Sequence, residues 1–323
     1  MNSSTGKEKL QAEQEDLVTV VIPAFHARSY LPEALASVRA QSYSSWELVV
    51  VDDCSPEQVD DLVQAFAATV PGYQVRLIRH SENKRLGAAR NTGILAANGE
   101  YVAFLDHDDV WRENHLRDAM VAMKSESADL VYCDLEVFHE KAGDILNWHP
   151  YPPDFWGPFP DNLYVQHSIA PSGVVMRKQT LKTLGLFDTN PSVHMCEDMD
   201  LWLRAAGTGC KFVHIPKPNL LYRFHSQSGS ANKRSMSAAK AYVLLKNLKA
   251  IPQVPLSLRL NRTCTVCAEA ARDCRADDPG RAAYFYLLSF RTDPKRLKHL
   301  CAYAYYSTIN FCHKIRTIYA RYR

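Results

Sequence analysis

Short apolar stretches alternate with amphipathic helical patterns over residues 17–105, and this alternation restricts the fold more than any other feature of the sequence. It is typical of β-α-β units, in which parallel strands are covered by the helices that connect them. Right-handed crossovers bring the carboxyl ends of such strands to one edge of the sheet, where ligands bind. We therefore expect an α/β fold with a mainly parallel central sheet. The predicted strands are 17–22, 46–51, 74–79 and 101–105, and the predicted helices are 30–41, 56–68 and 86–97.

Three carboxylates follow the fourth predicted strand within four residues. The apolar run 101–105 leads directly into Asp106, His107, Asp108 and Asp109. Clustered acids repel one another unless a cation or a hydrogen-bonding ligand shares their site. A hard divalent cation that is held by one or two carboxylates usually also binds phosphates. The run therefore predicts a divalent metal together with a phosphate-bearing ligand.

Other candidate binding residues lie after the first two strands and before the third helix. The first strand ends at Pro23, and the second ends in Asp52 and Asp53. Asp53 either caps a helix from Pro56 or accepts a hydrogen bond from a nucleobase or ribose, and both interpretations remain open. Arg85 lies where the helix dipole disfavours a cation, which suggests an anionic partner, with a solvated side chain as the alternative.

The second half of the chain supplies two further candidates. Glu197, Asp198 and Asp200 open a predicted helix at 197–206, and three acids are more than helix capping requires. A carboxylate in this position, beside a metal, is a candidate general base. His225 follows a predicted strand at 220–224 and is either a metal or phosphate ligand or a solvated turn residue. The Ser- and Gly-rich run 226–230 after it suits a mobile loop that closes over a ligand.

Composition and missing motifs exclude several classes of function. The 323 residues are 46% hydrophobic and 23% charged, with a net charge of +3, which is too small to indicate nucleic-acid binding. No G-x-G-x-x-G follows the first strand and no G-x-x-x-x-G-K-[ST] occurs, which argues against dinucleotide and P-loop folds. Nine scattered cysteines, without a visible signal peptide or membrane span, predict a cytoplasmic protein with reduced thiols. Cys264 and Cys267 lack the second half of a zinc site, so no zinc is expected.

The order and spacing of these motifs resemble those of the family 2 glycosyltransferases, which have the GT-A fold. The matching segments are 20–25, 49–53, 85–93, 99–109, 185–188 and 197–204. The resemblance covers residues 17–230 and implies a metal-dependent, inverting transfer of one sugar from a nucleotide-sugar, in particular a UDP-sugar, to an acceptor hydroxyl. The implied setting is the biosynthesis of cell-surface polysaccharide, lipopolysaccharide or another glycoconjugate. A catalytically silent nucleotide-sugar or carbohydrate-binding module is the alternative, against which the intact acids argue.

The resemblance also implies which residues bind the nucleotide. Pro23, Ala24 and Phe25 would line its pocket with backbone and ring contacts. Asp53 would bond the base, and Arg85 would support the same nucleotide.

The same resemblance assigns the metal and the chemistry. Asp106 would face the ribose, and Asp108 would hold Mn²⁺ or Mg²⁺ on the diphosphate. His225 would reach the metal or the diphosphate, and Asp198 would deprotonate the acceptor hydroxyl. Asp109 is expected only to cap a following helix.

The chain divides in this scheme into a flexible N-terminus 1–16, a catalytic domain 17–230 and a helical C-terminal region 231–323. Helices are predicted at 235–250, 257–273, 279–291 and 294–318. The segment 295–323 is basic and rich in tyrosine, which predicts either peripheral contact with the inner face of a membrane or packing on the catalytic domain. Membrane contact would suit a lipid-linked acceptor; a saccharide acceptor is the alternative. The aromatic loop 148–161 would pack as a lid, with one or two rings facing the acceptor.

Overall fold

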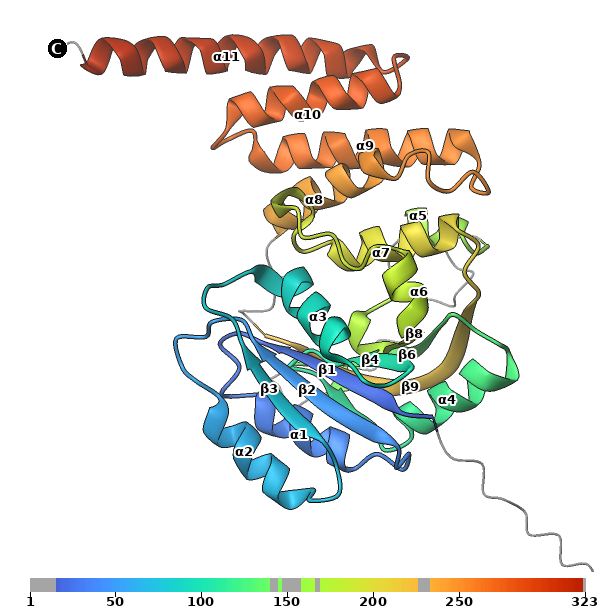
Figure 1. The fold of residues 1–323 in the computed structure, drawn as a ribbon. Coiled ribbons are helices and arrows are strands. Elements are labelled where there is room, and N and C mark those ends of the chain that lie inside the picture. Colours follow the sequence, from blue (N-terminus) through green and yellow to red (C-terminus); the bar gives the residue numbers. More distant parts are fainter. Residues whose placement is uncertain (1–15, 140–144, 147–157, 166–168, 226–232, 322–323) are drawn as a thin grey trace, which may run out of the picture.

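The computed structural model describes residues 16–139, 145–146, 158–165, 169–225 and 233–321. They form a region built on a sheet and, beyond it, a stack of helices (Figure 1). Residues 1–15 of the predicted flexible N-terminus, most of the aromatic loop and the run 226–230 lie outside the described residues.

One mixed sheet of nine strands forms the centre of the first region. Its order is β3-β2-β1-β4-β8-β6-β9-β5, with β7 (Ile145–Leu146) paired to β6. The first four strands in this order run parallel and confirm the four predicted from the sequence: β1 (Val18–Ala24), β2 (Trp46–Asp52), β3 (Val75–Arg79) and β4 (Tyr101–Phe104).

The remaining strands are mixed in direction. β8 (Val174–Arg177) is antiparallel to β4, and β6 (Leu130–His139) is antiparallel to β8 but parallel to β9 (Phe212–Phe224). β5 (Val110–Trp111) pairs antiparallel with β9. The short β5 and the long β9 place residues 106–109 beside the end of β9, where His225 follows.

The sequence predicted a short strand at 220–224, whereas β9 is one continuous strand that begins at Phe212. Its pairing with β6 shifts register between Cys133 and Leu135, so that Ile215 and Leu220 flank an unpaired stretch. Pro216 and Pro218 lie in that stretch, where a proline costs no ladder hydrogen bond.

Helices cover both faces of the sheet. Val20 and Ile22 of β1 share one core with α1 (Leu31–Arg39), α2 (Asp60–Thr69) and α4 (His115–Ser125). Val21 points to the opposite face, because side chains alternate along a strand, and shares the other core with α3 (Arg85–Ala96), α6 (Lys178–Thr183) and α7 (Glu197–Gly207). α3 lies close against β1 because a Cβ on its Gly93 would be 2.3 Å from Val21 Cγ1.

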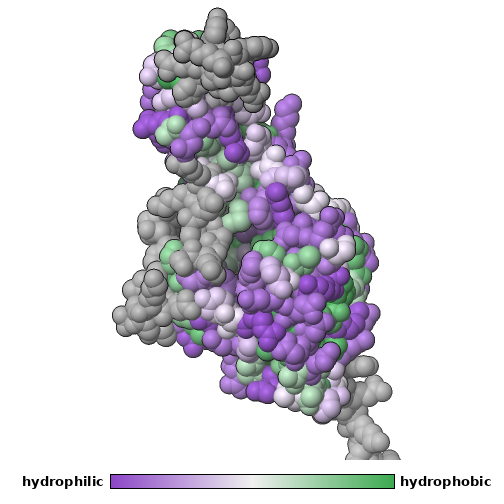
Figure 2. Space-filling view, turned by 90° about the vertical axis from the view of Figure 1, so that its left-hand side faces the viewer, coloured by the Kyte–Doolittle hydropathy of each residue, from purple (hydrophilic) through white to green (hydrophobic). Residues whose placement is uncertain are grey.

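The C-terminal part contains the four predicted helices: α8 (Lys233–Lys246), α9 (Leu256–Cys274), α10 (Pro279–Thr292) and α11 (Leu297–Arg321). The second core continues into them, since Phe104 of β4, Trp202 of α7, Leu244 of α8 and Phe285 of α10 belong to one buried cluster. The short α5 (Asp161–Val165) joins them through the Tyr164 hydroxyl, which donates to Leu244 O at 3.1 Å. The surface narrows where the helices meet the sheet region (Figure 2). Among the described helices, none combines the length and the apolar character needed to cross a bilayer.

Candidate active site

The carboxyl ends of β1, β2 and β4 meet at one edge of the sheet, as the sequence predicted. Ala24 is in register with Asp52, and Asp53 N–H donates to Ala24 O at 2.8 Å. Pro23 and Ala24 are buried, whereas Phe25 is 39% exposed at the rim of this edge. The backbone of β1 therefore ends beside Asp53, with an aromatic ring facing outward.

Asp53 is buried and holds the start of α3 in place. Its Oδ1 accepts from Lys84 N–H at 2.8 Å and lies 2.6 Å from His80 Nδ1. Among the described residues its Oδ2 has no hydrogen-bond partner, so one oxygen remains for a ligand. The predicted start of the second helix at Pro56 is wrong, because α2 begins at Asp60. Asp53 therefore does not cap that helix.

Arg90 connects two segments that are far apart in the chain. This α3 residue is 1% exposed. Its Nη2 donates to both oxygens of Asp106, at 2.7 and 3.0 Å, and its Nη1 donates to Glu197 Oε1 at 3.0 Å. The guanidinium also lies 5.4 Å from the ring centroid of Phe187. A single buried cation thereby fixes the end of β4 against the first residue of α7.

The three acids that open α7 have different environments. Glu197 is 3% exposed; burial raises the pKa of its carboxyl, and the charge of Arg90 opposes that rise. Asp200 is fully buried and binds α8, since Asn247 Nδ2 and Lys246 Nζ lie 2.8 and 2.7 Å from its Oδ1. Asp198 alone of the three is partly exposed, with Oδ1 accepting from Met199 N–H at 2.7 Å. Two acids are thus buried in contacts within the fold, and Asp198 is the one that stays accessible to solvent.

Asp108 and His225 come together at the opposite side of residues 106–109. His225 Nε2 lies 3.0 Å from Asp108 Oδ2, and the two side chains are 7% and 20% exposed, respectively. Arg223 Nε donates to the Asp108 carbonyl oxygen at 2.8 Å and so fixes the backbone that carries the carboxylate.

Asp109 is a structural residue, and the expectation that it caps a following helix is wrong. β5 follows it directly, and α4 begins only at His115. Its buried carboxylate accepts from the Ser172 hydroxyl and, at 3.0 Å, from Arg223 N–H. Burial, reinforced by the charges of Asp108 and Asp106, raises the pKa of Asp109 well above its usual value.

A divalent metal suits the donor atoms of Asp108 and His225. A carboxylate oxygen and an imidazole nitrogen are suitable ligands for Mn²⁺, and the neighbouring side chains already hold them in one place. The part of the chain that the structure describes holds no group of three or more His, Cys, Asp or Glu side chains suited to a metal. A metal with two protein ligands must complete its coordination with water or phosphate oxygens, as Mg²⁺ commonly does.

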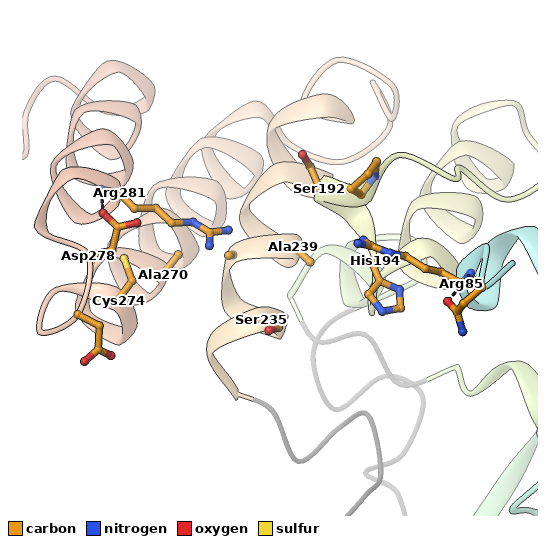
Figure 3. A pocket seen from close by; sticks show the side chains of 13 residues that line it. Arg85, Ser192, His194, Ser235, Ala239, Ala270, Cys274, Asp278 and Arg281 are labelled. Carbon is orange, nitrogen blue, oxygen red and sulfur yellow. Dashed lines mark hydrogen bonds between the residues drawn. The ribbon is translucent and has the colours of Figure 1, made fainter. Parts of the chain in front are cut away.

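Arg85 lies apart from the nucleotide-binding residues with which it was grouped. It is the first residue of α3, adopts φ +73°, and is exposed. Its neighbour Lys84 contacts Asp53 through the backbone, but the Arg85 side chain extends toward His194 and the helical region (Figure 3). The predicted contact of the aromatic loop with an acceptor stays a prediction; Phe159, the only aromatic residue of that loop within the described residues, packs against Phe212 with ring centroids 4.8 Å apart.

Arg90 and Arg223 were assigned no role from the sequence. Their partners Glu197 and Asp108 are 107 and 115 residues away along the chain. For Arg90 the available signal was its position within the motif segment 85–93, whereas Arg223 lies outside every matching segment; spacing alone does not predict which acid a buried arginine meets.

Comparison with known proteins identifies the family of this region. The family profile "Glycosyl transferase family 2" matches residues 19–175. The glucosyltransferase WfaP of Escherichia coli, named for UDP-Glc and α-D-GlcNAc-diphosphoundecaprenol, is 26% identical over 68% of this chain and 81% of its own length. The amylovoran biosynthesis glycosyltransferase AmsB of Erwinia amylovora is 28% identical over 67% of this chain and 72% of its own. Other curated relatives, 28–35% identical, match over only 37–58% of their length.

Solved structures show the same fold. S. aureus TarS 1–349 in complex with UDP-GlcNAc aligns with a TM-score of 0.65 at 16% identity, over 92% of this chain and 91% of that one. The mannosyltransferase PcManGT of Pyrobaculum calidifontis, in complex with GDP-Man and Mn²⁺, aligns with a TM-score of 0.59 at 18% identity, over 93% and 88%. The predicted GT-A architecture with a helical C-terminal extension is thereby confirmed.

Replacing Arg90 by alanine is expected to destabilise the fold by about 3–5 kcal/mol, because it leaves buried Glu197 without its cation. Urea unfolding of the full chain measures this cost. Arg28→Ala is the matched control, since its ion pair with Asp61 is exposed and should change stability little. Equal midpoints for the two variants would contradict a structural role for Arg90.

Proposed function

Because this chain belongs to glycosyl transferase family 2, we propose that it transfers one sugar from a UDP-sugar to an acceptor hydroxyl in cell-surface polysaccharide or related glycoconjugate biosynthesis. The observation that carries the proposal is the Arg90 bridge, which holds Asp106 of the donor edge next to Glu197, the first residue of α7, which Asp198 follows directly. A donor bound along 106–108 and an acceptor bound at Asp198 would meet in one site.

The donor is held by the sheet edge in this proposal. The free Oδ2 of Asp53 accepts a hydrogen bond from the base, the Pro23–Ala24 backbone and the Phe25 ring line its pocket, and Asp106 faces the ribose. A UDP-sugar is supported by the UDP-GlcNAc complex of TarS and by the UDP-Glc in the name of WfaP. Arg85 was expected to support the same nucleotide; its backbone follows Lys84, which contacts Asp53, but its side chain extends away from this pocket, so we propose at most a minor role for it in donor binding.

Catalysis rests on Asp198 and on a metal held by Asp108 and His225. Mn²⁺ or Mg²⁺ at that pair would stabilise the negative charge that develops on the leaving diphosphate. Asp198 takes the proton from the acceptor hydroxyl as it attacks. One base opposite the leaving group, with no second carboxylate as nucleophile, corresponds to a single displacement with inversion.

Asp198→Asn is expected to lower the rate of sugar transfer by at least ~10²-fold, because the amide cannot accept the proton. UDP binding should persist, since the donor pocket does not use Asp198. Product formation by chromatography and UDP binding by calorimetry measure the two effects, with Glu113→Gln, an exposed acid, as the control. Near-normal turnover would move the base role to another residue.

The metal assignment predicts that His225→Gln weakens Mn²⁺ binding in the presence of UDP by about 10–100-fold. Free Mn²⁺ measured by electron paramagnetic resonance reports binding without relying on activity. His214→Gln is the matched control, because His214 forms a similar 2.7 Å contact with Asp134 away from this edge. Identical Mn²⁺ affinity in the two variants, or sugar transfer that survives EDTA, would contradict the assignment.

A lipid-linked acceptor, as in the name of WfaP, suits the outer helix. α11 exposes Leu297, Leu300 and Tyr305 at helical positions that share one face, next to exposed Lys298. We propose that this face rests on the surface of an anionic membrane, where apolar and basic residues act together.

Exchanging both Leu300 and Tyr305 for glutamine should reduce sedimentation with anionic vesicles by about tenfold, because two apolar side chains no longer enter the interface. Leu95→Gln, which removes an exposed leucine from α3, is the control. Unchanged partitioning of the double variant would reject membrane contact through α11.

A further inference from the structure

A cavity of about 660 Å³ lies where the sheet region meets the helical region, and Arg85 is the one residue of its lining that was also assigned above to the donor. Its walls come from the start of α3, the turn Pro191–Val193 before α7, and the helices α8, α9 and α10. His194 lines it and lies four positions before Asp198 in the chain. His194 therefore joins the wall of the cavity to the short segment that leads into α7, the helix that carries the proposed general base.

Two arginines reach into the cavity from opposite walls. Arg85 comes from α3 and Arg281 from α10, and each points toward the space beside α8 (Figure 3). Among the described residues neither guanidinium has a carboxylate partner; Arg281 has only a cation–π contact with Phe285, at 5.8 Å. Two guanidinium groups that share a cavity without an acid between them are suited to an anionic ligand.

Both arginines occupy positions where they do not help their own helix. Arg85 is the first residue of α3, and Arg281 lies in the first turn of α10, where the helix dipole disfavours a cation. The α10 terminus is already capped, because Asp278 Oδ1 accepts from Arg281 N–H at 2.9 Å. Helix stability therefore does not explain either guanidinium.

The rest of the lining suits a sugar. Ser192 and Ser235 contribute hydroxyl groups to the lining, and the small side chains of Ala239 and Ala270 take up little of the cavity. Burial, together with the charge of Arg85, lowers the pKa of His194, so its imidazole is neutral near pH 7 and can exchange hydrogen bonds with hydroxyl groups.

Two acids limit which anion fits. Asp277 and Asp278 also line the cavity, at the end where α10 begins. A polyanion would meet these carboxylates along the wall, whereas a saccharide with one localised acidic group can contact the guanidinium tips alone.

We propose that this cavity is an acceptor subsite for an acidic saccharide, in which Arg281 and Arg85 bind a phosphate ester or a carboxylate of the acceptor while another hydroxyl reaches Asp198. The inference rests on the proposed sugar transfer and names the chemistry of its acceptor. Both anionic groups offer oxygens that accept charge-assisted hydrogen bonds from a guanidinium, and the experiment separates the two sources.

The test is calorimetric titration of the full chain with glucose 1-phosphate, glucuronic acid and neutral glucose, in EDTA and without nucleotide. At least one acidic sugar should bind more tightly than glucose, and the tighter one identifies the group. Arg281→Gln should weaken that binding by about 10–100-fold, the loss of a hydrogen bond to a charged group. The matched control Arg291→Gln removes an exposed arginine from the other end of α10 and should bind as the native chain does.

Arg281→Glu separates binding from folding. An acid at this position forms a capping pair with Asp278, so the thermal midpoint should stay equal or rise while acidic sugars no longer bind. Equal binding of glucose and the acidic sugars, or unchanged binding in Arg281→Gln, would overturn the subsite. So would an equal loss of UDP binding in Arg281→Gln, because the arginine would then serve the donor.

Failure of the native chain to bind UDP or to transfer sugar would instead refute the proposed function and leave the anion titration intact.

Discussion

The buried guanidinium of Arg90 is the interaction on which the site depends. Burying an arginine is unfavourable unless its charge is matched, and here two carboxylates from different segments match it through Nη1 and Nη2, whereas Nε has no hydrogen-bond partner among the described residues. Satisfying both requires the end of β4 and the start of α7 to adopt one relative position. Asp106 and Asp198 are therefore placed together by the same contact that makes the burial of Arg90 tolerable.

A second buried arginine has the same effect on the other side of the 106–109 segment. Arg223 lies between the rings of Tyr30 and Phe138, with centroids at 4.7 and 4.4 Å, and its Nη2 contacts Glu33 at 2.6 Å. Its Nε holds the carbonyl of Asp108. The four-residue run after β4 is thus fixed at both ends, one by a cation from α3 and the other by a cation from β9. Of the three acids in this run, Asp106 and Asp108 stay partly exposed, whereas Asp109 is buried.

The features that could be predicted from the sequence are those that depend on residues close to one another in the chain. The parallel strands and the edge of acids followed from local periodicity, because each β-α-β unit specifies its own geometry. The role of each acid could not be predicted, because it depends on burial. Asp109 and Asp200 are aspartates like Asp108 and Asp198, yet both are buried among hydrogen-bond donors. The continuous β9 was missed for a similar reason, since its prolines are tolerated only because the pairing with β6 slips there.

The helical region is joined to the chemistry by α7, and this bears on how an acceptor is positioned. Asp200 lies two residues after Asp198 and accepts from Asn247 and Lys246 at the end of α8. α8 in turn supplies one wall of the cavity between Arg85 and Arg281. The wall proposed to contact the acceptor and the carboxylate proposed to deprotonate it are therefore connected through the contacts of buried Asp200 with Asn247 and Lys246. An acceptor hydroxyl reacts fast only if it is held in a fixed position relative to its base. A misplacement of about 1 Å can lower the reaction rate by ~10²-fold. The helical extension can hold an acceptor in such a fixed position, because it shares a buried core with α7.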